Sequence, residues 1–116
     1  MFKVTDERVR EAYLFLRGLP PFSKWNLPPP GQCVFGLLIR ESHHAEYIRD
    51  GKHYILVNAD THITLTDHLM SVAHEMVHLR QELIGRLPFK GDGHNGEFRR
   101  LAKQVCVATG WDLQKF

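Results

Sequence analysis

Apolar residues recur with the spacing of an α-helix in the second half of the chain. Because steps of three and four residues keep side chains on one face of a helix, this pattern predicts an amphipathic helix over residues 66–84. Thr66 or Asp67 is expected to cap its start, and Gly85 followed by Pro88 is expected to end it. The positions that carry the pattern are Leu65, Leu69, Val72, Ala73, Met76, Val77, Leu79 and Leu83.

The same periodicity predicts one helix at each end of the chain. The first covers residues 5–16, with Thr5 as its cap and a Gly-Leu-Pro-Pro sequence as its stop. The last runs from about residue 95 to residue 109, and Gly110 ends it. Its apolar face consists of Phe98, Leu101, Ala102, Val105 and Cys106.

The region between the first two helices has the patterns of a connector and of strands. Five prolines lie in residues 20–31, which predicts an extended loop that Phe22 and Trp25 attach to the core. Strands are expected at 33–40, 44–49 and 52–58, the last two joined by a hairpin at Asp50-Gly51, and 63–65 is expected to add a short fourth strand. The predicted fold is α+β, with a small antiparallel sheet of three to four strands.

Length and composition indicate one ordinary globular domain. The 116 residues suffice for a single core, and 43% hydrophobic and 24% charged residues are typical of globular proteins. No apolar run reaches the length of a membrane span, and the charged start of the chain is unlike a signal peptide, so we expect a cytoplasmic protein without membrane contact. In a reducing compartment Cys33 and Cys106 are expected to be small buried hydrophobes rather than a disulfide.

The sequence His74-Glu75-Met76-Val77-His78 forms the motif H-E-x-x-H within the predicted central helix. Residues four apart share a helix face, so the two histidines can bind one metal ion. Glu75 lies about 100° round the helix, where it can act on a metal-bound water without being a ligand. Met76 and Val77 are expected to face the core. Chance gives this motif in about 3 of 100 chains of this composition, so a solvated helix with two ordinary histidines is the competing interpretation.

A catalytic zinc usually has three protein ligands, so a third must come from another part of the chain. His94 is the best candidate, because the glycine-rich segment 91–96 presents it from a turn just before the last helix. Glu97 is the alternative, since it lies about where a thermolysin-type enzyme has its glutamate. If His94 is the ligand, Glu97 is expected to cap or orient the site.

These motifs resemble those of one known family. H-E-M-V-H, then fourteen residues, then G-H-N-G-E-F at the start of a basic amphipathic helix is similar to the SprT-like family of zinc metallopeptidases, which includes the protease domain of Spartan. The resemblance covers residues 64–111 and extends to the N-terminal part only through the order of elements. It implies a zincin-like fold in which His74, His78 and His94 bind one Zn²⁺ and Glu75 is the general base.

The chain departs from the family pattern in two respects. Asn95 stands where the family has glycine, which is expected to change the flexibility of the loop more than metal ligation. Many members also carry a C-terminal zinc ribbon with four cysteines, and the two cysteines of this sequence cannot form one. The resemblance therefore does not extend to the functions that the ribbon performs, including part of substrate or DNA recruitment.

The expected function is a zinc-dependent endopeptidase that cleaves extended protein segments. The metal would lower the pKa of its water towards ~7, and Glu75 would take the proton and later pass it to the leaving amine. The resemblance adds proteins bound to DNA as a substrate class. Arg99, Arg100 and Lys103 form a local basic face that could contact DNA or another partner, although the net charge of +2 is modest. The alternative is a non-catalytic domain that zinc stabilises and that binds protein or DNA.

Overall fold

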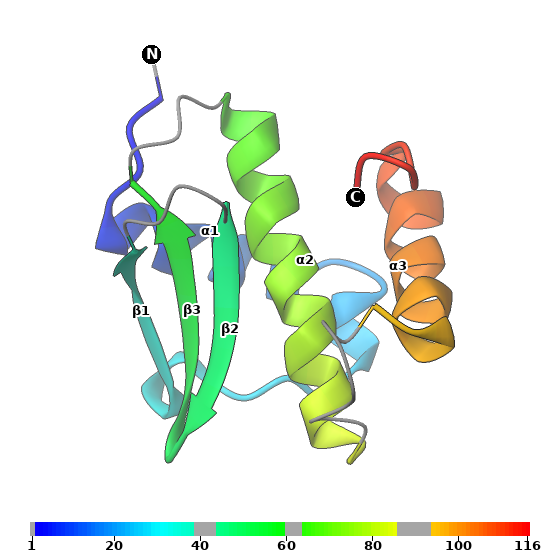
Figure 1. The fold of residues 1–116 in the computed structure, drawn as a ribbon, viewed down its shortest axis with the longest axis horizontal. Coiled ribbons are helices and arrows are strands. Elements are labelled where there is room, and N and C mark those ends of the chain that lie inside the picture. Colours follow the sequence, from blue (N-terminus) through cyan, green and yellow to red (C-terminus); the bar gives the residue numbers. More distant parts are fainter. Residues whose placement is uncertain (1, 39–43, 60–63, 86–93) are drawn as a thin grey trace.

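The computed structural model describes residues 2–38, 44–59, 64–85 and 94–116, and in these ranges the fold is α+β as predicted (Figure 1). Two short 3₁₀ helices, Phe22–Lys24 and Pro30–Gln32, connect the first helix to the sheet. The helices are α1 (Asp6–Arg17), α2 (Leu65–Leu83) and α3 (Gly96–Thr109), and the strands are β1 (Cys33–Leu38), β2 (Ala45–Asp50) and β3 (Lys52–Asn58).

The sheet is mixed, so the prediction of an antiparallel sheet is wrong. Its strand order is β1-β3-β2, with β3 antiparallel to β2 and parallel to β1. The hairpin at Asp50-Gly51 is confirmed, and Gly51 has a φ of 73°, which suits a residue without a side chain. Alternation of apolar residues predicts strands but not their order. Here β3 is the central strand, and its Ile55 and Val57 are at most 1% exposed.

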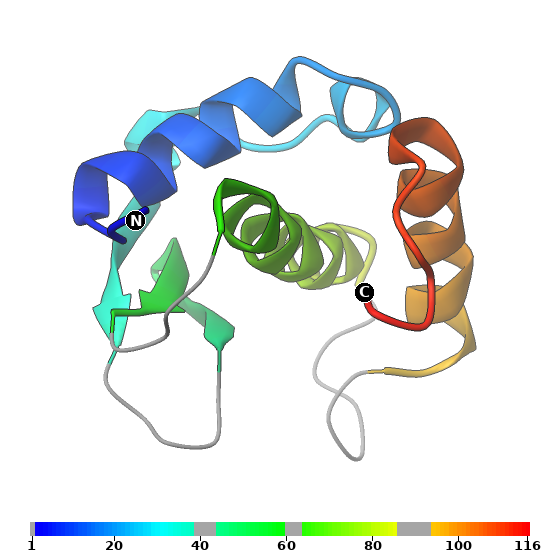
Figure 2. The same cartoon turned by 90° about the horizontal axis from the view of Figure 1, so that it is seen from above.

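Helix α2 is the element around which the others pack. It contacts α1, α3 and both strands of the hairpin, and Figure 2 shows it between α1, the sheet and α3. The predicted inward orientation of Met76 and Val77 is confirmed, because both are fully buried. Burying such side chains contributes roughly 1.5–3 kcal/mol each. The position of α2 is therefore set by apolar packing on several sides.

The start of α2 differs from the prediction. Thr64, and neither Thr66 nor Asp67, is the N-cap: its hydroxyl accepts from the backbone N–H of Asp67 at 3.1 Å, and the Asp67 carboxylate accepts from the backbone N–H of Thr64 at 3.1 Å. This reciprocal capping box satisfies two N–H groups that a helix start leaves without partners. Because Leu65 already belongs to the helix, the predicted short strand fails at Thr64 and Leu65; residue 63 lies outside the described ranges.

The other predicted boundaries agree more closely with the structure. Thr5 caps α1, and Gly110 ends α3 with a φ of 82°. The apolar face predicted for α3 is buried as a whole. The predicted strand over 33–40 ends at Leu38 in the described part, and residues 39 and 40 lie outside it.

The connector is less extended than predicted, because it contains the two short 3₁₀ helices. Phe22 and Trp25 are nevertheless buried in the core as expected, with their rings edge to face at 5.0 Å. Cys33 and Cys106 are buried too.

None of the helices in the described ranges is long and apolar enough to cross a membrane. The longest, α2, carries the charged residues Asp67, Glu75, Arg80 and Glu82 along its 19 residues.

His68 is a buried histidine on α2 that packs against the N-terminal segment. It is 1% exposed, its Nε2 lies 3.1 Å from the carbonyl oxygen of Arg8, and its ring is 4.8 Å from that of Phe2. Burial lowers the pKa of His68 below 6.5, and the charge of Arg8 lowers it further, while the hydrogen bond to the Arg8 carbonyl opposes the shift. The folded chain therefore favours the neutral ring.

This burial predicts a pH-dependent loss of stability. An unfolded chain takes up the proton of His68 at a pKa of about 6.5, whereas the folded chain takes it up only at lower pH. The free energy of unfolding should therefore fall as the pH drops below about 6.5 towards the folded pKa. In His68→Gln this fall should be smaller, as measured by urea unfolding at neutral and mildly acidic pH with a chelator present. An equal fall in both proteins would contradict the prediction.

Candidate metal centre

Three imidazole rings meet between α2 and the start of α3. His74 and His78 lie one turn apart on α2, and His94 comes shortly before α3. The Nε2 atom of His94 is 2.9 Å from Nε2 of His74 and 3.1 Å from Nε2 of His78. In the described part of the chain, these three residues form the group whose ligand atoms could hold a metal ion, with all of those atoms within 4.8 Å of one another.

The spacing of the three nitrogens fits a small metal ion. Tetrahedral zinc with Zn–N bonds of 2.0–2.1 Å requires ligand nitrogens roughly 3.4 Å apart. The observed distances of 2.9 and 3.1 Å are slightly shorter. The ligand atoms of the remaining pair, His74 and His78, lie within 4.8 Å of each other, so small movements of the rings would bring all three nitrogens close to this spacing.

Hydrogen bonds on the far side of two rings leave Nε2 as the atom that could bind a metal. Nδ1 of His74 lies 2.8 Å from the carbonyl oxygen of Phe116, and Nδ1 of His78 lies 2.8 Å from Oε1 of Gln81. A carbonyl oxygen only accepts, so each Nδ1 carries the proton and donates it. The neutral ring then has its lone pair on Nε2, where a metal can bind.

Phe98 packs against the whole cluster from α3. The centroid of its ring is 4.9 Å from that of His74, 4.8 Å from that of His78 and 4.5 Å from that of His94. The ring of Phe116 lies 5.4 Å from that of His74. These apolar contacts restrict rotation of the imidazoles and limit the access of water to them.

The way the chain presents His94 agrees with its predicted role. The side chain of Asn95 accepts from the backbone N–H of Phe98 at 3.0 Å and so forms the N-cap of α3. His94 thus lies outside the helix, directly before its cap. Residues 91–93 of the glycine-rich turn are outside the described ranges.

The side chain of Glu75 points from α2 towards the strand β2. Its side chain is buried, the backbone N–H of Tyr47 donates to its carboxylate, and the charge of Glu46 is nearby. Burial first, and the like charge of Glu46 second, raise the pKa of Glu75 to about 8, while the hydrogen bond from Tyr47 lowers it. A carboxyl group with such a pKa can both accept and donate a proton near neutral pH.

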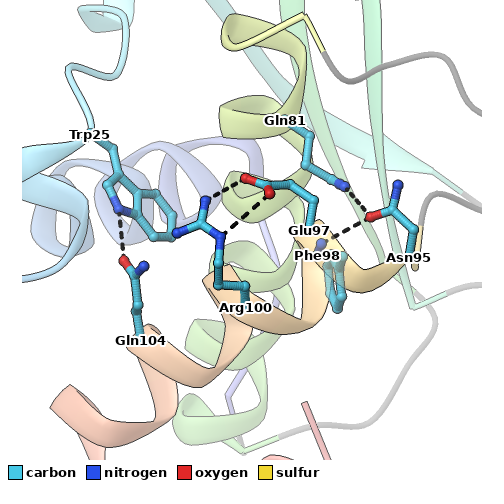
Figure 3. A network of polar contacts seen from close by, with 7 residues as sticks. All are labelled: Trp25, Gln81, Asn95, Glu97, Phe98, Arg100 and Gln104. Atoms are coloured by element: carbon cyan, nitrogen blue, oxygen red, sulfur yellow. Dashed lines mark hydrogen bonds and ion pairs between the residues drawn. The ribbon is translucent and has the colours of Figure 1, made fainter.

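Glu97, the alternative ligand, has a different partner. Its carboxylate forms an ion pair with the guanidinium of Arg100 at 2.5 and 3.4 Å (Figure 3). It is not part of the histidine group that could hold a metal among the described residues. The geometry therefore favours His94 as the third ligand. The predicted basic residues Arg99, Arg100 and Lys103 are all exposed on α3, and the ion pair with Glu97 partly offsets their charge.

The remaining described histidines lie outside this cluster. His44 is exposed, and His68 is the core residue described above. His53 is buried, with Nε2 2.8 Å from Nη1 of Arg49 and Nδ1 2.7 Å from the hydroxyl of Tyr47. His43 and His62 lie outside the described residues.

Sequence reasoning missed three groups that support the candidate site. Gln81 follows His78 by one helical step of three, a spacing that could have identified it as a partner. The carbonyl of Phe116 and the backbone N–H of Tyr47 are main-chain groups brought in by folding. No residue type marks such groups in a sequence.

The cluster predicts that the chain binds one Zn²⁺ and that each histidine is needed. In His94→Ala, zinc affinity should fall by more than the roughly 10–100-fold that is typical for residues that only orient a ligand. Competition with a chromophoric chelator measures this affinity. His44→Ala is the matched control, because His44 is exposed and outside the cluster. Wild-type affinity in His94→Ala would contradict the assignment.

Comparisons with known proteins do not extend this picture. The chain matches no family model, no curated protein and no solved structure. The candidate site therefore stands on the geometry of His74, His78 and His94 and on the groups around them.

Proposed function

We propose that the chain is a zinc-dependent endopeptidase with a zincin-like fold, similar to the SprT-like family. One observation carries the proposal. The Nε2 atoms of three imidazoles converge beside α2, and the residue that follows His74 on this helix is the buried Glu75. Three imidazoles leave a fourth position for water or substrate, as catalytic zinc sites do. A site that only stabilises a fold has no need for an acid-base residue next to its ligands.

The roles of the residues follow from their positions. Zinc, when bound, polarises the carbonyl of a peptide bond and lowers the pKa of water. Glu75 accepts a proton from the attacking water as the C–O bond forms, and it then donates a proton to the leaving amine as the C–N bond breaks. The Tyr47 backbone N–H holds the Glu75 carboxylate during both steps. Phe98 keeps the imidazoles in place and excludes water from one side.

The strand β2 is the proposed binding site for the substrate. In the described part of the sheet β2 is an edge strand, paired with β3 alone, and its Tyr47 reaches Glu75. The backbone groups along a sheet edge can pair with an extended peptide. A segment bound there would pass beside the proposed base, which favours unfolded or extended polypeptide as the substrate. That such polypeptides include proteins on DNA is implied by the family resemblance alone.

The decisive variant is Glu75→Gln, which keeps the shape of the side chain and removes its basicity. It should bind one zinc with wild-type affinity, and its cleavage of a labelled unfolded protein should fall by roughly 10²–10⁴-fold, as expected for loss of a general base. Glu82→Gln is the matched control, because Glu82 is a glutamate of intermediate exposure seven residues along the same helix. Its activity should remain close to that of the wild type.

Two results would refute the proposal in different ways. Cleavage by Glu75→Gln at the wild-type rate would exclude Glu75 as the base. Wild-type protein that binds zinc but cleaves nothing, in the presence or absence of DNA, would favour the non-catalytic zinc-stabilised binding domain.

A further inference from the structure

Gln81 is a polar side chain that is fully buried on α2, at 0% exposure. A buried amide is destabilising unless its oxygen and nitrogen both find hydrogen-bond partners. Its Oε1 lies 2.8 Å from Nδ1 of His78, and its Nε2 lies 3.2 Å from Oδ1 of Asn95. The amide therefore connects a metal-ligating histidine on α2 with the residue next to His94.

A backbone group fixes the direction of this chain of hydrogen bonds. The backbone N–H of Phe98 can only donate, so the atom of Asn95 that faces it at 3.0 Å is the carbonyl oxygen Oδ1 (Figure 3). Oδ1 can only accept, so Gln81 must present its NH₂ group to Asn95. The Oε1 of Gln81 then faces His78, and Nδ1 of His78 must carry the proton.

We propose that Gln81 is a positioning residue that, through Asn95 and the Phe98 N–H, locks His78 in the tautomer with Nδ1 protonated and Nε2 open to the metal. This inference rests on the proposed metal centre. The lock has an energetic consequence, because neutral imidazole in water prefers its proton on Nε2, where it blocks coordination. The hydrogen bonds that run from the Phe98 N–H through Asn95 and Gln81 to His78 form a relay. This relay disfavours the Nε2-protonated form in the metal-free protein.

The relay also joins the two parts of the site. Asn95 is the cap of α3 and directly follows His94, whereas His78 and Gln81 are on α2. One set of hydrogen bonds therefore sets the tautomer of His78 and the distance of His94 from α2. Asn95 occupies the position where the SprT-like pattern has glycine, which has no side chain to complete this relay.

Three variants distinguish the loss of the relay from a general loss of folding stability. Gln81→Met keeps the length of the side chain but removes both hydrogen bonds. Asn95→Gly removes the acceptor at a position of intermediate exposure, and glycine is well tolerated as an N-cap, so this variant should fold even where Gln81→Met does not. Asn95→Asp keeps an acceptor for both Phe98 and Gln81. Gln104→Met is the matched control, because Gln104 contacts Trp25 at 3.4 Å and lies outside the relay (Figure 3).

Two readouts are needed, and neither is enzyme activity. The first is the ¹⁵N–¹H correlation spectrum of the imidazoles in metal-free protein at a pH where His78 is neutral, which shows the nitrogen that carries its proton. The second is zinc affinity by chelator competition. In the wild type, Asn95→Asp and Gln104→Met, His78 should be protonated on Nδ1. In Gln81→Met and Asn95→Gly the Nε2-protonated form should become prominent, and zinc affinity should fall by roughly 10–100-fold.

The outcomes distinguish the relay from the metal-centre proposal. An unchanged His78 tautomer in both Gln81→Met and Asn95→Gly would overturn the relay, as would an equal loss of affinity in Gln104→Met. Absence of zinc binding in the wild type would refute the metal centre, while the tautomer spectra would still decide whether the relay exists. Zinc binding without peptidase activity would leave the relay intact and refute only the proposed enzyme.

Discussion

Helix α2 is packed against α1, the sheet and α3, so every polar side chain that points into this packing needs a partner. Four such side chains are buried on it: His68, Glu75, His78 and Gln81. An unpaired buried polar group costs about 1–3 kcal/mol, and the apolar packing that holds α2 would not easily offset several of them. Each of the four has at least one partner, from α1, from β2, from α2 itself or from the start of α3, and Nδ1 of His68 is the one ring nitrogen among them that is buried without a partner. The candidate site is one result of that arrangement.

The same constraint explains the division of roles along the helix. Glu75 turns towards the edge strand β2 and accepts from the backbone of Tyr47. His74 and His78 turn towards α3, where Phe98 packs against both rings. The proposed base and the proposed ligands therefore lie on adjacent sides of one helix. An extended peptide on β2 would lie on the side of the base, and a metal ion would lie on the side of α3.

Local features of the sequence predicted much of this arrangement. The periodicity of apolar residues gave the three helices, and Asp50-Gly51 gave the hairpin, because both depend on neighbours within a few residues. The H-E-x-x-H spacing together with the turn before α3 identified the three histidines that the fold brings together. These signals are short in range and carried by particular residue types.

The features that the sequence did not reveal depend on contacts between distant segments. Strand order follows from the way β1 pairs with β3, and alternation of residue types is the same for either order. The expectation for Asn95 considered only the loop, whereas in the fold its side chain meets Gln81, fourteen residues earlier in the chain. The carbonyl of Phe116 reaches His74 across 42 residues. Tertiary packing decides such pairs.

The central claim is that His74, His78 and His94 hold one zinc ion through Nε2, with Glu97 outside the coordination sphere. Anomalous diffraction at the zinc edge, on crystals grown with one equivalent of zinc, tests this most directly. The account predicts a single strong peak about 2.0–2.1 Å from each of the three Nε2 atoms, with a non-protein atom in the fourth position. A peak bound to the Glu97 carboxylate in place of His94, or no peak between α2 and α3, would contradict it.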